Sequence, residues 1–187
     1  LGDVYKRQMY AVGGLMKHAE ALTSITCSTV NSYNGLVPRV GGFEGGTVTW
    51  APTNITYGHN NRSAQFRLPQ NRYCIENRAA DMTMNVYLAL AVTMSAAVEG
   101  IEKKIHPGDP TDQDLYDMSE SEFKRLGIKR LPRNLLMALD AFKKDKLIDD
   151  VLGTVMKKSL LAYKNDEWER YHQAVTDWEV KEYLRLY

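Results

Sequence analysis

Between residues 39 and 78 the chain has five arginines and no lysine, although lysine is common in the rest of the chain. A guanidinium is permanently charged and can bond a carboxylate or a phosphate through two parallel hydrogen bonds. The stretch therefore predicts an anion site formed by Arg39, Arg62, Arg67, Arg72 and Arg78. The alternative is structural ion pairing with the acidic residues of the same region, Glu44, Glu76 and Asp81.

Two of these carboxylates could take part in chemistry. Strand alternation places Glu76 on the same face as Arg72 and Arg78, which indicates either a salt bridge or one ligand of a hard cation such as Mg²⁺. One carboxylate does not make a metal site, so the other ligands would come from elsewhere. Glu44 lies in a glycine-rich loop, where it could act as an acid or base or simply be solvated.

Other catalytic patterns are missing from the sequence. The four histidines lack the spacing of a zinc site, and no dinucleotide, P-loop or nucleophile-elbow motif occurs. Cys27 and Cys74 form no CxxC motif and are too few for a disulfide scaffold, so they indicate buried thiols in a reducing compartment.

The composition describes an ordered chain of 187 residues, with 44% hydrophobic residues and a net charge of +1. This balance argues against a protein dominated by nucleic-acid or anionic-membrane binding. The uncharged stretch 82–98 is shorter than a membrane span and predicts a buried helix. Residues 1–100 carry 14 charged side chains and residues 101–187 carry 33, so the second part reads as solvated helices.

The elements that must position the arginines follow from periodicity and turn residues. Alternation predicts strands over 47–50, 63–68 and 72–78, after an irregular loop over 31–46. Apolar residues at helical spacing predict helices over 9–22 and 85–103. Three further apolar stripes predict helices around 135–142, 147–156 and 168–178.

A series of short motifs follows in a fixed order: GGLMKHA at 13–19, NSY at 31–33, LVP at 36–38, NRSAQFRLP at 61–69, IENR at 75–78, NVYLA at 85–89, EGIEKKIHPG at 99–108 and DLYD at 114–117. Together they resemble the C-terminal part of the catalytic domain of the glutamine synthetase superfamily. The tail, with EWERY at 167–171 and DWE at 177–179, is more similar to the type III-like and γ-glutamylmethylamide synthetase-like branch.

The resemblance implies an α+β fold, with a partial antiparallel β-sheet, packed helices and a helical C-terminal extension. Residues 9–187 would be the C-terminal part of the catalytic domain, of which 9–108 carry the site and 109–187 form the extension. Residues 1–8 do not match the family pattern and are expected to be non-family sequence.

The resemblance also implies an ATP-dependent carboxylate–amine ligase. Such an enzyme uses Mg²⁺ or Mn²⁺ to form γ-glutamyl phosphate from glutamate and ATP, and ammonia then attacks it to give an amide. Methylamine or another amine is an alternative to ammonia, and a non-catalytic paralogue is a further alternative. A cytoplasmic enzyme that forms a homo-oligomeric ring is expected.

Residue roles carry over motif by motif. Glu76 matches the divalent-metal ligand, and Arg78 the arginine facing the substrate carboxylate and phosphate. Arg62 matches the arginine that assists phosphoryl transfer, and Arg67 one on the nucleotide phosphates. Glu44 matches the flap carboxylate that takes a proton from the incoming ammonium.

The sequence departs from the family pattern in three places. Gly35 stands where the family has the arginine that holds the glutamate carboxylate, and Arg39 is the candidate to replace it. The route from Pro38 to Glu44 is longer than usual, and Cys74 replaces an arginine. The upstream part of the family's catalytic domain, with most metal ligands, has no counterpart here, so the chain alone is expected to be incomplete and inactive.

Overall fold

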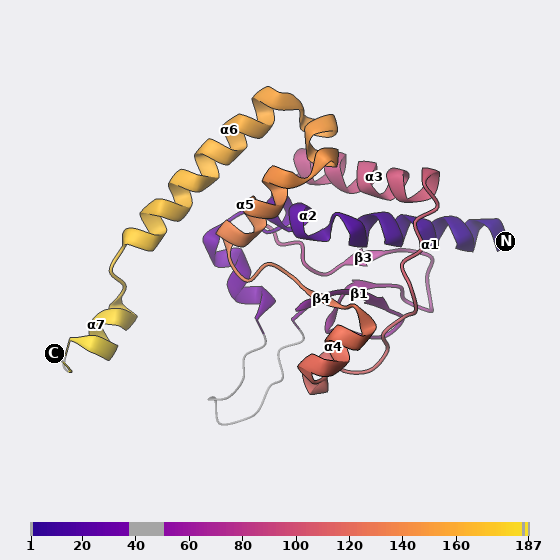
Figure 1. Ribbon diagram of the computed structural model, residues 1–187, viewed down its shortest axis with the longest axis horizontal. Coiled ribbons are helices and arrows are strands. Elements are labelled where there is room, and N and C mark those ends of the chain that lie inside the picture. The colour runs from indigo at the N-terminus through magenta and orange to yellow at the C-terminus, as the bar shows by residue number, and fades with distance from the viewer. Residues whose placement is uncertain (1, 38–50, 185, 187) are drawn as a thin grey trace.

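The computed structural model describes residues 2–37, 51–184 and 186. Its helices are α1 (Gly2–Lys17), α2 (Ala19–Thr26), α3 (Val86–Glu102), α4 (Glu120–Leu126), α5 (Leu135–Lys144), α6 (Lys146–Gln173) and α7 (Asp177–Tyr183), with short 3-10 helices at Val30–Leu36 and Leu115–Asp117. The strands are β1 (Asn54–Gly58), β2 (Ala64–Arg67), β3 (Glu76–Asn77) and β4 (Lys129–Arg130). Figure 1 shows α1 and α2 between the sheet and α3. The predicted α+β fold with a helical C-terminal extension is confirmed.

The sheet has the order β3-β2-β1-β4. Strands β2 and β3 pair antiparallel, as do β1 and β4, but β1 and β2 pair parallel, so the expectation of a purely antiparallel sheet is wrong for that pair. The reason lies in residues 59–63, which return alongside β1 before β2 begins. Asn61 anchors this return by donating hydrogen bonds to the carbonyls of Thr111 and Gln113, at 2.7 and 2.8 Å.

Several predicted elements change their bounds. The helix expected at 9–22 is two helices, α1 and α2, which meet at His18. The strand expected at 72–78 is reduced to Glu76–Asn77, and it ends there because the Asn77 side chain accepts a hydrogen bond from the Ala79 backbone and turns the chain. The strand expected at 63–68 is β2, and the strand expected at 47–50 lies outside the described residues.

Helix α3 confirms the helix predicted at 85–103, and Asn85 caps it by accepting hydrogen bonds from the backbones of Tyr87 and Leu88. It packs on α1 through glycine: a Cβ atom at Gly14 would lie 2.1 Å from the Ala96 carbonyl oxygen, and one at Gly100 would lie 2.1 Å from the Tyr10 carbonyl oxygen. The two backbones are therefore in direct contact.

Only one face of α3 is buried. Its opposite side exposes five apolar side chains, those of Val86, Tyr87, Leu90, Met94 and Val98, so the expectation of a fully buried helix holds for half its surface. Among the described residues, no helix combines the length and the apolar character that crossing a bilayer requires.

His18, at the junction of α1 and α2, connects these helices to α3 and to the α5–α6 junction. Its Nδ1 lies 2.8 Å from Oδ2 of Asp145, the residue between α5 and α6, and its Nε2 contacts Oε2 of Glu99 on α3. Lys17 and Lys103 bond the other oxygen of Glu99. We call His18, Glu99 and Asp145 the His18 cluster. It fixes the N-terminal helices to the middle and the C-terminal part of the chain.

The C-terminal helices agree with the predicted stripes, with different bounds. The 135–142 stripe is α5, the 147–156 stripe begins α6, and the 168–178 stripe is shared by α6 and α7. Gly153, at φ 67°, kinks α6. The following part of α6 and α7 extend away from the sheet (Figure 1), and α7 has no buried residue.

Candidate functional site

The centre of the site is a pair of opposite charges on neighbouring strands. In the β2–β3 register Arg67 lies directly opposite Glu76, and Arg67 Nη1 donates to Glu76 Oε2 at 3.1 Å. Arg72 bonds the other carboxylate oxygen, Oε1. The predicted grouping of Glu76 with arginines is therefore observed, and it includes the structural ion pairing that the sequence left open.

These contacts favour the charged form of the carboxylate. Burial alone would raise the pKa of Glu76, but the hydrogen bonds and positive charges of Arg67 and Arg72 hold that pKa below its usual range. Glu76 is therefore ionised at neutral pH, which is the state in which a carboxylate can bind a cation.

Arg62, which precedes β2, and Arg78, which directly follows β3, extend the positive charge next to these strands. The Arg78 backbone N–H donates to the Gln65 carbonyl at 2.8 Å, and Arg78 Nε donates to the Arg62 carbonyl at 3.1 Å. Burial lowers the pKa of the Arg78 guanidinium, and the charges of Arg62 and Arg67 also lower it. This mutual repulsion shows that three arginines gather around one carboxylate. We call Arg62, Arg67, Arg78 and Glu76 the arginine cluster.

Some buried polar atoms of this face lack a partner within the described part of the chain. They are the Nε of Arg67 and both side-chain amide atoms of Gln65. Gln65 and Arg67 are two residues apart on β2, so they share a face of the sheet. Since buried polar groups are nearly always hydrogen-bonded, this face is suited to a polar ligand or to another part of a protein.

The remaining predicted residues have different outcomes. Arg39 and Glu44 lie outside the described residues. Cys27 is buried, and burial raises the pKa of its thiol to about 12, in agreement with an inert thiol. Within 2–37 and 51–184, no group of three or more His, Cys, Asp or Glu residues could hold a metal ion.

The structure adds two residues that the sequence did not single out. Asp112 bonds His59 at two points: it accepts from the His59 backbone N–H at 2.6 Å, and its Oδ2 lies 2.9 Å from His59 Nδ1. The neighbouring Asn60 accepts from Arg67 Nη2 at 3.5 Å, which joins this pair to the arginine cluster. The partners His59 and Asp112 are separated by 53 positions, so no local pattern could reveal them.

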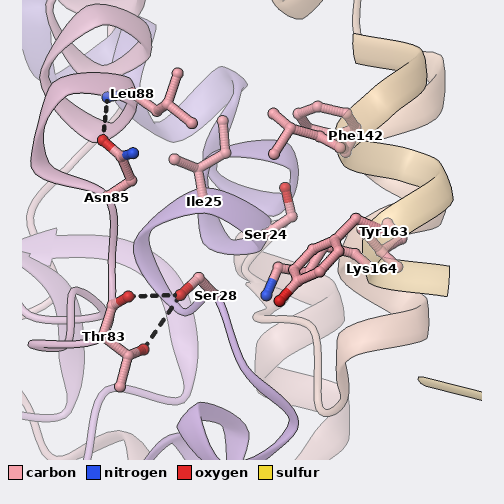
Figure 2. Close-up of a pocket in the computed structure, with 11 residues that line it drawn as sticks. Ser24, Ile25, Ser28, Thr83, Asn85, Leu88, Phe142, Tyr163 and Lys164 are labelled. Atoms are coloured by element: carbon pink, nitrogen blue, oxygen red, sulfur yellow. Dashed lines mark hydrogen bonds between the residues drawn. The ribbon is translucent and has the colours of Figure 1, made fainter. Parts of the chain in front are cut away.

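A separate cavity of about 230 Å³ lies between α2, the start of α3, α5 and α6. Figure 2 shows Ile25, Leu88 and Phe142 against it, with Ser24, Tyr163 and Lys164 also on its lining. The Ser28 hydroxyl closes one side by donating to the Thr83 carbonyl at 3.0 Å. None of its lining residues belongs to the arginine cluster, so the cavity is a separate feature.

The family model of the glutamine synthetase catalytic domain matches residues 4–183. The chain belongs to this family. A glutamate–methylamine ligase of Methyloversatilis universalis is 44% identical over 174 residues, which are 93% of this chain and 38% of the relative. A glutamine synthetase of Methanocaldococcus jannaschii is 42% identical over 176 residues, or 92% of this chain and 37% of the relative.

Solved structures of the glutamine synthetase family have the same fold. A GmaS/ADP complex superposes with a TM-score of 0.80 at 32% identity, over 96% of this chain and 40% of that one. GmaS without ligand gives a TM-score of 0.76 at 31% identity, over 96% of this chain and 38% of that one. The chain therefore spans less than half the length of the relatives it matches.

Proposed function

We propose that this chain forms the C-terminal part of the active site of an ATP-dependent ligase that joins glutamate to ammonia or an amine. The observation that carries the proposal is the arginine cluster, with Arg67 directly opposite Glu76. It lies in a chain of the glutamine synthetase family.

The reaction proposed for this cluster brings anions together. A glutamate carboxylate must attack the terminal phosphoryl group of ATP, and negative charge then spreads over the phosphoryl oxygens. Fixed cations stabilise that charge as it develops. We assign Arg67 to the nucleotide phosphates, Arg62 to phosphoryl transfer, and Arg78 to the substrate carboxylate and phosphate. Arg39 as a further substrate contact and Glu44 as the proton acceptor complete the proposal.

Glu76 fits a divalent metal in one respect, because it is an ionised carboxylate beside phosphate-binding arginines. Both of its oxygens are engaged by Arg67 and Arg72, so Arg72, whose side chain is 61% exposed, would have to release it. The other ligands would come from outside the described residues. A bound Mg²⁺ or Mn²⁺ would neutralise phosphate charge at this position.

The amine is the second part of the proposal. Relatives with both specificities match the chain to similar degrees, at 44% for a glutamate–methylamine ligase and 42% for a glutamine synthetase. GmaS is a glutamate–methylamine ligase, so its solved structures favour methylamine as the second candidate for the amine. We further propose that the intact enzyme is a cytoplasmic homo-oligomeric ring.

The test is ATP-dependent phosphate release by the intact protein that contains residues 1–187, with glutamate and either ammonia or methylamine. Phosphate should be released only when ATP, glutamate and one of the amines are all present. Arg67→Ala should lower the rate at least tenfold, the scale of a lost charge-assisted hydrogen bond. Arg170→Ala is the matched control, because Arg170 pairs with Asp166 on α6, away from the cluster. Release with another carboxylate but not with glutamate would overturn the glutamate assignment.

A further inference from the structure

His59 lies on the connection between β1 and β2, and hydrogen bonds give its ring a defined orientation. Asp112 accepts from the His59 backbone N–H and also bonds Nδ1 of the ring, so two bonds from one carboxylate fix the ring. A carboxylate accepts hydrogen bonds only, so Nδ1 must carry the proton. The other ring nitrogen, Nε2, makes no hydrogen bond within the described residues, and the His59 side chain as a whole is 42% exposed.

The segment that carries Asp112 is itself built onto β1. The Thr111 backbone N–H donates to the Tyr57 carbonyl at 2.8 Å, and Asn61 donates to the Thr111 carbonyl at 2.7 Å. Gly58 permits this approach, because a Cβ atom there would lie 2.5 Å from the Thr111 oxygen and 3.0 Å from Asp112 Oδ1. These two hydrogen bonds and the missing side chain at Gly58 fix the position of Asp112, and Asp112 in turn fixes that of His59.

That position adjoins the arginine cluster. Asn60 follows His59 directly and accepts from Arg67 Nη2 at 3.5 Å, while Arg62 lies three residues after His59. The cluster holds three guanidinium groups and one carboxylate, so its excess charge is positive, and an anion is the ligand it fits. Asp112 adds negative charge only on the Nδ1 side of the ring, away from Nε2.

We propose that His59 contacts the bound nucleotide, donating a hydrogen bond from Nε2 to a phosphate oxygen, and that Asp112 is the positioning residue that holds the ring. This inference rests on the proposed function, because it takes the nucleotide as the ligand of the arginine cluster. With Nδ1 donating to Asp112 and Nε2 donating to the phosphate, the ring is an imidazolium, and Asp112 balances its charge.

Two substitutions separate a ligand contact from a structural role. His59→Asn keeps a polar group near Nδ1, where it can bond Asp112, but removes the group at Nε2. His59→Gln places an amide near Nε2 and loses the match to Nδ1. His172→Asn, on the part of α6 that extends away from the sheet, is the control. Binding of MgATP and of magnesium tripolyphosphate is measured by calorimetry on the intact protein, with thermal melting to verify folding.

His59→Asn should weaken binding of both ligands about tenfold, His59→Gln about threefold or less, and His172→Asn not at all. In the wild type, the Nε2 resonance of His59 in ¹⁵N NMR spectra should shift when tripolyphosphate binds. The inference is overturned if His59→Asn binds MgATP or magnesium tripolyphosphate as tightly as wild type does. It is also overturned if His59→Gln weakens binding as much as His59→Asn does. A wild type that does not bind MgATP overturns the proposed function instead.

Discussion

Replacing His18 with leucine should destabilise the fold by about 3–5 kcal/mol, the usual cost of removing one partner from a buried ion pair. The His18 side chain is 6% exposed, and those of Glu99 and Asp145 are 13% and 14% exposed. Leucine would fill similar space but leave two nearly buried carboxylates facing each other without the cation between them. For a chain of this size, the melting temperature should fall by about 6–20 °C.

The stabilisation contributed by His18 should decrease as the pH rises. Both ring nitrogens of His18 face carboxylate oxygens, which only accept, so both must carry protons. Burial alone would lower the pKa of His18, but the bonds to Asp145 and Glu99 raise it above its ordinary value of 6.5. The folded state thus binds this proton more tightly than the unfolded state. Its stabilisation is complete below pH 6.5 and is lost as the pH rises through the raised pKa.

Glu99 sets the acid limit of the same cluster. Burial would raise its pKa, but Lys103, Lys17 and His18 lower it to about 2, from an ordinary value of 4.5. Its contribution is present above pH 4.5 and is lost as the pH falls through about 2. The cluster therefore stabilises the fold most between these limits.

The assay is urea denaturation followed by circular dichroism from pH 5 to pH 9. Wild type should lose free energy of unfolding above pH 6.5, and His18→Leu should lose that slope. Adding Asp145→Asn to His18→Leu should restore part of the loss, because it removes one unpaired charge while asparagine can still cap α6 at the Leu147 backbone. A flat wild-type profile from pH 6 to pH 9, together with a cost of His18→Leu below about 1 kcal/mol, would refute the reasoning.

Three further predictions follow from other contacts. Gly14→Ala should cost several kcal/mol and lower the melting temperature, because its Cβ would lie 2.1 Å from the Ala96 carbonyl, whereas Gly35→Ala, with no atom within 4 Å of the new Cβ, is the neutral control. Gly58→Ala should weaken MgATP binding, since the new Cβ displaces Asp112, and wild-type affinity in this variant would contradict the reasoning. Glu76→Gln should raise the Mg²⁺ concentration for half-maximal phosphate release at least tenfold, and an unchanged metal titration would count against a ligand role.

Much of the fold could be predicted because local chemistry determines it. Asn85 begins the helix predicted at 85–103 and caps α3 within its first turn, whereas α4, which Gly127 ends in the left-handed conformation, was not predicted. Arg72 does bond Glu76 as expected, but strand alternation is not the reason, because only Glu76–Asn77 form the strand. The parallel β1–β2 pair was not predictable in this way, since it depends on Asn61 bonding a segment 50 residues later.

The site was predictable in its residue types but not in its pairing. The sequence indicated that Glu76 lies among arginines, whereas only the register shows that Arg67 is its cross-strand partner. His59 and Asp112 gave no signal, because an isolated histidine and one acid among several have no periodicity. The same holds for His18, whose two carboxylate partners lie 81 and 127 positions away. The contacts that could not be predicted are those between residues far apart in the sequence, because local propensities do not encode them.

The His18 cluster also bears on the order in which the molecule can be assembled during synthesis. The separation of 127 positions between His18 and Asp145 means that this bond cannot form until Asp145 has left the ribosome. Helices α1 and α2 pack against α3 and α5, which are translated much later. Until then Val12, Leu15 and Leu22, all buried in the finished fold, lack the packing partners that α3 and α5 provide. Nascent chains should therefore depend on chaperones that shield apolar helices, and should fold slowly because their decisive contacts are distant in sequence.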